Sequence, residues 1–309
     1  MSASFQQSVR RALSNPVLQE ALDNNATRRK AGARRANATL VDPVAVRQHA
    51  RAIRQTVLDN WDPMLTTLIE SCQANGIVVL QAASAEQACA HVLDIARRHN
   101  VRLVAKAKSM VSEEIHLNPY LERAGLKVVE TDLGEFIVQL RGEPPAHIIT
   151  PALHLRRQEV GRTFAEHLGM PFTEEVSVMT DVARRTLRQT FLTADMGISG
   201  VNLAAADTGT LCLVTNEGNG RMVTTLPPVH VALMGIERLV PTIEDLALIL
   251  QLLPRNATGQ ILTSYVTLIQ GPGRLSIADG SQHRYLILID NGRRAMHGTP
   301  LAAVHCRSG

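Results

Sequence analysis

Residues 197–228 read GISGVNLAAADTGTLCLVTNEGNGRMVTTLPP, and the interpretation of the fold starts from this stretch. Two apolar runs, residues 201–206 and 211–215, are separated by a short segment of turn composition around Asp207 and Gly209. Apolar runs joined by such a segment are typical of paired antiparallel strands. The stretch therefore predicts a β-hairpin.

A polar loop is predicted directly after the second run, where residues 216–221 read NEGNGR. Its two glycines allow backbone conformations that are closed to other residues, and its crowded polar side chains suit a small anionic or polyhydroxyl ligand. The alternative is two ordinary surface turns, because Gly and Asn are common in loops of every kind. The candidate ligand-binding residues from the hairpin and this loop are Asn202, Thr208, Asn216, Asn219 and Arg221.

Two carboxylates in the same stretch are candidates for proton transfer. Asp207 and Glu217 each lie beside the end of an expected strand. A carboxylate near backbone amides can have its pKa tuned for such a role. We therefore name Asp207 and Glu217 as the candidate catalytic residues.

The composition is that of a globular α/β protein. The chain has 309 residues, of which 45% are hydrophobic but only 3% aromatic, so the core must consist of Ala, Val, Leu and Ile. No apolar run is long enough to span a bilayer, and the first residues lack a hydrophobic signal core. We expect a cytoplasmic protein without a membrane span.

The cysteines Cys72, Cys89, Cys212 and Cys306 contain no C-x-x-C pair. This spacing indicates neither a disulfide framework nor a zinc site. We expect the first three to be small buried hydrophobes, and no metal site is predicted within the chain.

The first 60 residues are basic, with ten Arg or Lys against four acidic residues, a net charge of +6 that leaves −2 for the remainder of the +4 total. A basic arm can bind nucleic acid or an acidic partner. The arginines around residues 28–35 have no interleaved aromatics and no recognised nucleic-acid motif, which favours a solvated helix or a docking arm without nucleic acid. We expect a helical arm over residues 1–60 and a separate domain over residues 61–295.

A β-α-β unit is predicted next. Residues 77–80 and 101–105 are apolar strand-like runs, and Ser84 with Gln87 forms a capping box for the helix between them. Ligands of such parallel units gather beyond the carboxyl ends of the strands. There the chain reads KAKSMVSEE, and a helix start of this kind attracts anions.

The candidate ligand-binding residues from this segment are Lys106, Lys108, Ser109 and Glu113. The alternative is that Ser109 or Ser112 only caps the helix while the lysines point to water. A third strand over residues 126–130 adds Asp132 and Glu135 at its carboxyl end, and a turn over residues 271–274 adds Arg274.

The remaining elements follow from apolar periodicity and turn residues. Further strands are expected at residues 136–140, 147–150, 223–226, 229–234, 264–269 and 285–289. Helices are expected at residues 62–75, 155–168, 181–194 and 242–254. The pattern predicts an α/β fold with a parallel sheet, flanking helices and an antiparallel hairpin part.

The predicted hairpin and four other segments together resemble the lactate utilization (LUD) family: AKSMVSEEIHLN at residues 107–118, VVETDLGEFIVQL at 128–140, IITPALH at 148–154 and EGNGRM at 217–222. The resemblance extends from about residue 8 to residue 307. It implies a NagB/RpiA/CoA transferase-like fold, similar to sugar-phosphate isomerases and coenzyme A transferases. It also implies a subunit of a three-part bacterial system that oxidises L-lactate to pyruvate, with the other two subunits as partners.

The family resemblance also implies two four-iron (4Fe-4S) clusters, held by cysteine runs that follow the LUD region. Here the chain reads Cys306-Arg307-Ser308-Gly309, and one thiolate cannot hold a cluster that needs four. We therefore expect residues 296–309 to be the truncated start of the cluster region, with Cys306 at most a remnant ligand and no cofactor in this chain.

Two functions remain open at this level. The LUD domain is expected to bind a small anionic or organic ligand within the lactate-oxidising system, and whether the chain is itself an oxidoreductase stays open. No G-x-G-x-x-G follows a strand, so no tightly held nicotinamide or flavin is expected. The alternative is a non-catalytic assembly module that docks the other subunits through its basic arm.

Overall fold

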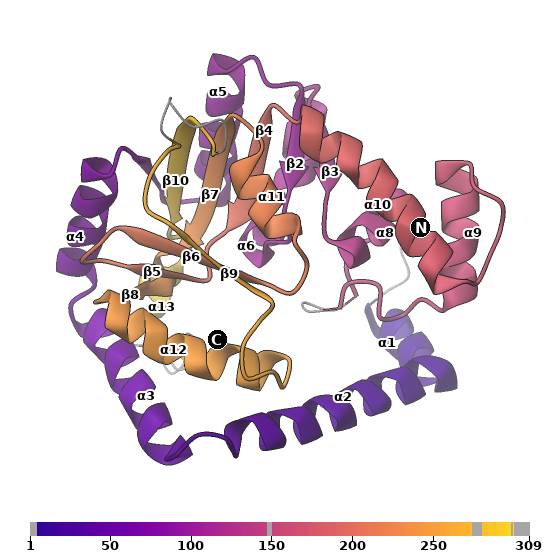
Figure 1. The fold of residues 1–309 in the computed structure, drawn as a ribbon, viewed down its shortest axis with the longest axis horizontal. Coiled ribbons are helices and arrows are strands. Elements are labelled where there is room, and N and C mark those ends of the chain that lie inside the picture. The colour runs from indigo at the N-terminus through magenta and orange to yellow at the C-terminus, as the bar shows by residue number, and fades with distance from the viewer. Residues whose placement is uncertain (1–4, 147–149, 274–279, 298, 300–309) are drawn as a thin grey trace.

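The computed structural model describes residues 5–146, 150–273, 280–297 and 299 (Figure 1). The helices are α1 Phe5–Leu13, α2 Pro16–Asn37, α3 Pro43–Asp59, α4 Trp61–Ala74, α5 Ala85–Arg98, α6 Met110–Glu114, α7 Leu117–Arg123, α8 Leu133–Leu140, α9 Arg157–Leu168, α10 Val176–Thr193, α11 Asn219–Thr225, α12 Ile243–Ala257 and α13 Arg293–Met296. The strands are β1 Val78–Ala82, β2 Leu103–Lys106, β3 Lys127–Glu130, β4 Met196–Gly200, β5 Leu203–Ala205, β6 Thr210–Thr215, β7 Val229–Gly235, β8 Leu239–Val240, β9 Tyr265–Ile269 and β10 His283–Ile289.

A parallel sheet of six strands, in the order β1-β10-β7-β4-β2-β3, forms the centre of the fold. Successive residues of a strand point to opposite faces, so an apolar strand such as β10 needs cover on both sides. Ile287 faces α5 and α7, whereas Leu286 and Leu288 face α4. On that second side, α10 and α11 cover the β2 and β3 end of the sheet. The predicted α/β class is confirmed.

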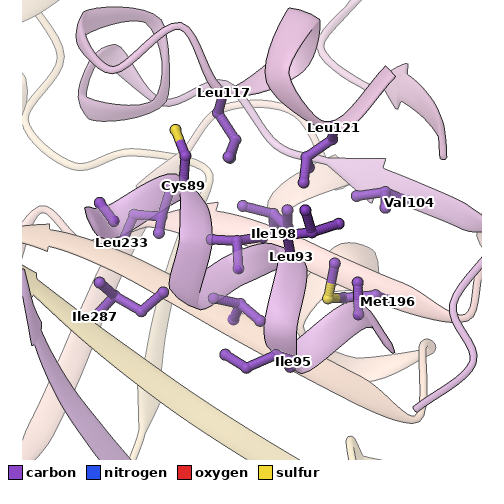
Figure 2. Packing of buried hydrophobic residues seen from close by; sticks show 14 of the residues in the cluster. Cys89, Leu93, Ile95, Val104, Leu117, Leu121, Met196, Ile198, Leu233 and Ile287 are labelled. Carbon is purple, nitrogen blue, oxygen red and sulfur yellow. The ribbon is translucent and has the colours of Figure 1, made fainter. Parts of the chain in front are cut away.

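The core is aliphatic, as the composition predicts. Figure 2 shows Cys89 and Leu93 of α5 and Leu117 of α7 packed toward Ile198 and Leu233 of the sheet. These side chains are at most 8% exposed. Burying such side chains is the main favourable term in folding.

The predicted hairpin is confirmed, and it belongs to a second, mixed sheet in the order β8-β5-β6-β9. Strands β5 and β6 are antiparallel, with Leu203 opposite Cys212. In the turn, Gly209 has φ +64°, and a Cβ there would lie 2.7 Å from the backbone nitrogen of Cys72. Glycine is therefore required where the hairpin turn packs against α4.

Two expected strands are helices. Residues 136–140 belong to α8, which begins because the Asp132 side chain accepts hydrogen bonds from the amides of Gly134 and Glu135. Residues 223–226 overlap α11, which begins within the expected polar loop. A short apolar run contains too few residues to show whether its periodicity is that of a strand or of a buried helix.

Other differences are smaller. The β-α-β strands β1 and β2 are parallel as predicted, but β10, β7 and β4 lie between them, and β1 is an edge strand on which Val78 is 49% exposed. Helix α4 begins at Trp61, α10 begins at Val176, and α12 continues past Pro254. The expected strand at residues 147–150 falls largely on residues 147–149, which lie outside the described residues, as do Arg274 and Cys306.

The arm is helical as predicted, and its last helix contributes to the core. Ile53 and Val57 of α3 are buried, and Arg54 donates a hydrogen bond of 2.9 Å to the carbonyl of Glu237. Helix α2 runs beneath α12 (Figure 1). A boundary near residue 60 stays a prediction. Within the described residues, no helix is long and apolar enough to cross a membrane.

Candidate functional site

The candidate site lies where β2, β3 and β4 end. Lys106 is the last residue of β2, and it is paired in register with Glu130, the last residue of β3. Parallel strands end at one edge of the sheet, so the residues that follow them collect there. Helices α6 and α8 start at this edge, and α11 approaches it from the second sheet.

Lys106 is the centre of a buried ion cluster. Its side chain is fully buried, and Nζ lies 2.8 Å from Oε1 of Glu130 and 3.2 Å from Oε1 of Glu113. Nζ also donates a hydrogen bond of 2.8 Å to Oγ of Ser112. Burial alone would lower the pKa of Lys106, but Glu130 and Glu113 together raise it. Lys106 is thus a charged internal partner of two carboxylates and does not point to water.

The same cluster contains buried acceptors without donors. Asn118 donates a hydrogen bond of 2.6 Å to Oε1 of Glu130. Within the described part of the chain, Oε2 of Glu130, Oδ1 of Asn118 and Oε1 of Glu135 are buried without a hydrogen-bond partner. Buried polar atoms normally have partners, so this concentration of exceptions marks the cluster as unusual.

Glu135 has a strongly raised pKa. Burial is the largest of the causes that raise the pKa of Glu135 to about 7, and repulsion from Glu130 and Glu113 adds to it. A carboxyl group with such a pKa can both accept and deliver a proton under physiological conditions. Glu135 is therefore the residue of the site best suited to proton transfer.

Two further carboxylates lie at the start of α8. Asp132 Oδ1 accepts hydrogen bonds from the amides of Gly134 and Glu135, at 3.0 and 3.1 Å, and Glu217 Oε2 accepts one from the amide of Leu133 at 3.3 Å. The amino end of a helix favours negative charge. Even so, burial, followed by the charge of Asp132, raises the pKa of Glu217.

Lys108 lies within electrostatic reach of these acids. Burial lowers the pKa of Lys108, against the opposing charges of Asp132, Glu135 and Glu217. The lysine is thus partly desolvated beside three acidic groups. Its ammonium group is therefore our candidate partner for a ligand carboxylate.

Helix α11 contacts the site from the side of the second sheet. Asn219 is buried, and its Nδ2 lies 3.5 Å from Oγ1 of Thr131. A Cβ on Gly220 would lie 2.7 Å from Cγ2 of Thr215, so glycine lets the helix approach β6. Neither Gly218 nor Gly220 has a positive φ. Close packing, and not an unusual backbone conformation, explains Gly220.

A family model described as the LUD domain matches residues 65–286, which is more than half of the chain. The chain belongs to the LUD domain family. It is 40% identical over 304 residues to lactate utilization protein B of Bacillus velezensis, covering 98% of this chain and 64% of that protein. It is 44% identical over 259 residues to lactate utilization protein B of Bacillus subtilis, covering 84% of this chain and 54% of that protein.

The LUD family relatives also include the uncharacterized electron transport protein YkgF of Escherichia coli K12, which is 41% identical over 94% of this chain and 62% of its own length. The chain therefore spans roughly three fifths of the length of these relatives. Among solved structures, a DUF162 family protein from Deinococcus radiodurans matches with 13% identity and a TM-score of 0.43, covering 74% of this chain and 97% of that one.

The LUD domain brings together most of the candidates predicted from the parallel strands and two candidates, Glu217 and Asn219, from the polar loop after the hairpin. Those that meet at the edge of the sheet are Lys106, Lys108, Ser109, Glu113, Asp132, Glu135, Glu217 and Asn219. Ser109 caps α6 by accepting a hydrogen bond of 3.3 Å from the amide of Ser112, as the alternative interpretation had it. Arg221 lies exposed on α11.

Four other candidates from the hairpin and the loop after it have internal partners instead. Asn202 Oδ1 accepts from the amide of Val214, Thr208 Oγ1 bonds Thr210, and Asn216 bonds Gln260 and Ser264. Asp207 Oδ2 accepts from the amide of Ile243.

The two candidate catalytic residues, Asp207 and Glu217, do not lie together. The whole of β6 lies between them, and its six residues span about 20 Å. Asp207 belongs to the turn at one end of this strand, and Glu217 follows the other end.

Glu130, Asn118 and Thr131 were missed by reading the sequence. The available signal was position: Glu130 ends the third strand as Lys106 ends the second. Parallel strands that end together place such residues side by side. Asn118 had no comparable signal, because it reaches the cluster only through the packing of α7.

The described residues do not fit an iron-sulfur cluster. Cys72, Cys89 and Cys212 lie on α4, α5 and β6, and burial raises the pKa of their thiols to about 12, 11 and 12. Cluster ligands are thiolates, which such burial opposes. Within the described residues, no group of three or more His, Cys, Asp or Glu is placed to hold a metal ion.

Proposed function

We propose that this LUD domain chain works as a subunit of a bacterial system that oxidises L-lactate to pyruvate, with a small organic anion bound at the carboxyl ends of β2 and β3. The relatives named lactate utilization protein B support this assignment. The proposal includes the NagB/RpiA/CoA transferase-like fold, the cytoplasmic location and the two partner subunits that the family resemblance implies. It assigns the two 4Fe-4S clusters to the full-length family proteins and no electron-transfer step to the described residues.

The Glu135 carboxyl group carries this proposal. It is 3% exposed, has an unpartnered buried oxygen and lies close to Lys106, Glu130 and Lys108 in the same electrostatic cluster. Oxidation of a 2-hydroxy acid to a 2-oxo acid releases the hydroxyl proton and passes the C2 hydrogen with two electrons to an acceptor, which the proposal places outside the described residues. The substrate carboxylate needs a cation. Glu135, with Glu217 as a second carboxylate, would exchange the proton, and Lys108 would hold the carboxylate. Asp207 is left out because its carboxylate serves the start of α12.

A ligand screen by thermal unfolding of the full chain tests this role. L-lactate, pyruvate, sugar phosphates and acyl-coenzyme A compounds are titrated against wild type and two matched variants. Glu135→Gln changes the site, and Glu70→Gln makes the same chemical change on the exposed face of α4. A ligand at 100 times its Kd stabilises a protein by about 2.7 kcal/mol.

We expect a saturable stabilisation of wild type and Glu70→Gln that is lost in Glu135→Gln. If none of these compounds stabilises wild type, or if the two variants respond alike, the proposed site is wrong.

The second candidate function, an assembly module, is favoured by the basic surface of α2. Lys30, Arg34 and Arg35 are exposed there. Deletion of residues 1–41 removes this surface and keeps α3, whose Ile53 and Val57 belong to the core. If the arm docks the other subunits, the deleted chain keeps a cooperative melt and fails to copurify with them. Copurification at the wild-type level contradicts the docking role.

A further inference from the structure

A pocket outside the Lys106 cluster lies between α2 and the end of α12. Its volume is about 250 Å³, and it is lined by Asn25, Arg28, Arg29 and Thr258. Figure 1 shows α2 running beneath α12, so the arm and the domain each contribute one wall. None of the four lining residues is acidic.

The two walls are held in a fixed relation. Gly259 has φ +74°, and a Cβ there would lie 2.7 Å from the backbone of Gly32, so the two backbones touch. Arg29 Nη1 donates a hydrogen bond of 2.8 Å to the carbonyl of Ala257, in the last turn of α12. A cation is stabilised at that end of a helix. The position of Arg29 is thus determined by the docked arm.

Arg29 is also oriented from its own helix. Its Nε donates a hydrogen bond of 2.6 Å to Oδ1 of Asn25, one turn earlier on α2. Since Nε and Nη1 are both engaged, the guanidinium plane is held, and Nη2 has no acceptor in the described part of the chain. Among the described residues, Arg28 uses only Nε, in a 3.4 Å contact with the carbonyl of Asn24.

The pocket therefore has cationic donors and no anion of its own. Over the ranges that the structure describes, no salt bridge involves Arg28 or Arg29. Burial, followed by the charge of Arg28, lowers the pKa of Arg29, as expected for like charges placed side by side. A bound anion would relieve this repulsion and use the remaining N–H groups.

We propose that this pocket binds the phosphate group of a small molecule through Arg28 and Arg29. Guanidinium groups match phosphate oxygens with paired hydrogen bonds. A tetrahedral phosphate accepts hydrogen bonds from several directions, so it can bind Arg28 and Arg29 together although the two side chains leave the helix in different directions. The charge of Arg29 also acts on Lys108, so the pocket lies near the carboxyl edge of the sheet. The proposal does not depend on the role in lactate oxidation.

Isothermal titration calorimetry on the full chain tests the proposal, with inorganic phosphate, pyrophosphate and, for comparison, citrate as probes at an ionic strength held constant with NaCl. Arg28→Gln removes one guanidinium, and Arg29→Lys keeps the charge but removes the planar fork. Arg51→Gln is the matched control, because Arg51 is an exposed arginine of the same basic arm on α3. Circular dichroism confirms that each variant is folded.

We expect saturable binding of pyrophosphate that weakens about tenfold in Arg28→Gln, the change produced by one charge-assisted contact, and stays within about twofold in Arg51→Gln. Arg29→Lys should also weaken binding by several fold. Equal weakening in Arg28→Gln and Arg51→Gln would mean unspecific attraction to a basic helix and would overturn the proposal. Absence of saturable binding by wild type, or tighter binding of citrate than of pyrophosphate, would overturn it as well. If Arg29→Lys fails to fold, the comparison of Arg28→Gln with Arg51→Gln decides.

Discussion

Two ion clusters lie at the same edge of the six-stranded sheet, and they differ in how completely their atoms are paired. The Lys106 cluster follows β2 and β3, and the second cluster, formed by Arg293, Glu237 and Glu114, follows β7 and β10. Helix α6 connects them, since Glu113 pairs with Lys106 and Glu114 with Arg293.

Every carboxylate oxygen of the Arg293 cluster has a partner. Arg293 Nε lies 2.5 Å from Oε2 of Glu237, and its Nη1 and Nη2 lie 2.9 and 2.8 Å from the two oxygens of Glu114. Arg238 reaches Oε1 of Glu237 at 3.2 Å, and Asn291 donates to Glu114 at 2.6 Å. Burial would raise the pKa of Glu114, but hydrogen bonds from Arg293 and Asn291 hold this pKa below its usual value.

The Lys106 cluster has a fully buried cation but, within the described residues, leaves carboxylate oxygens of Glu130 and Glu135 without donors, and the pKa of Glu135 is raised to about 7. A polar network in which every group is paired makes a structure rigid, whereas a network with unpaired groups is stabilised when it binds a proton or a ligand. The Arg293 cluster is therefore a structural ion-pair network, whereas the Lys106 cluster is a candidate site, although both lie at the same edge of the sheet.

The largest effect is expected from Lys106→Met. Glu130 would remain buried without its cation, and breaking a buried pair in this way costs about 3–5 kcal/mol. Urea unfolding measures the loss. The control is Lys127→Met at the exposed start of β3, which should change stability by less than about 0.5 kcal/mol. A loss under about 1 kcal/mol in Lys106→Met would show that the cluster does not hold the edge together.

Arg293→Leu should cost somewhat less, about 3 kcal/mol, because Arg238 still partners Glu237 and Glu114 is partly exposed. The neighbouring Arg294→Leu removes only exposed ion pairs and should cost about 0–1 kcal/mol. Chemical unfolding gives both values. Ligand stabilisation should persist in Arg293→Leu, and its loss would mean that the two clusters are not functionally distinct.

Glu135→Gln should change how stability depends on pH. The folded pKa is raised, so the carboxyl group favours the folded state fully below pH 4.5, and this contribution is lost as the pH rises through about 7. The rise from 4.5 to about 7 corresponds to at most about 3 kcal/mol. Unfolding free energies at pH 5 and pH 8 should therefore differ less in the variant than in wild type. Glu70→Gln should keep the wild-type difference, and an unchanged difference in Glu135→Gln would contradict the assignment.

The smallest effect on stability is expected from Glu217→Gln, under about 1 kcal/mol. The amide oxygen still accepts from Leu133, and the repulsion from Asp132 disappears. Thermal unfolding with and without ligand measures both properties. Reduced ligand stabilisation with unchanged stability would place Glu217 in the site, whereas an unchanged ligand response would leave Glu135 as its only proton-transfer group.

The sequence by itself determined the features that depend on contacts within a few residues. The hairpin follows from its turn, and helices α5 and α12 begin at Ser84 and Thr242, whose side chains accept from the third helical amide. Helices also stop at Gly76 and Gly169, which adopt the positive φ that glycine permits. Local hydrogen bonds and backbone freedom decide these points wherever the segment lies in the fold.

Only the tertiary structure decided whether residues 136–140 form a strand or a helix, because Ile137 gains its burial from Phe164 and Met179 on α9 and α10. The tertiary structure also decided which residues meet at the candidate site. Lys106 meets Glu130 through the register of two strands, and Glu217 meets Leu133 across two sheets, whereas Asp207 is separated from Glu217 by the length of β6. Such contacts join residues far apart in the chain, and their formation depends on how whole elements pack.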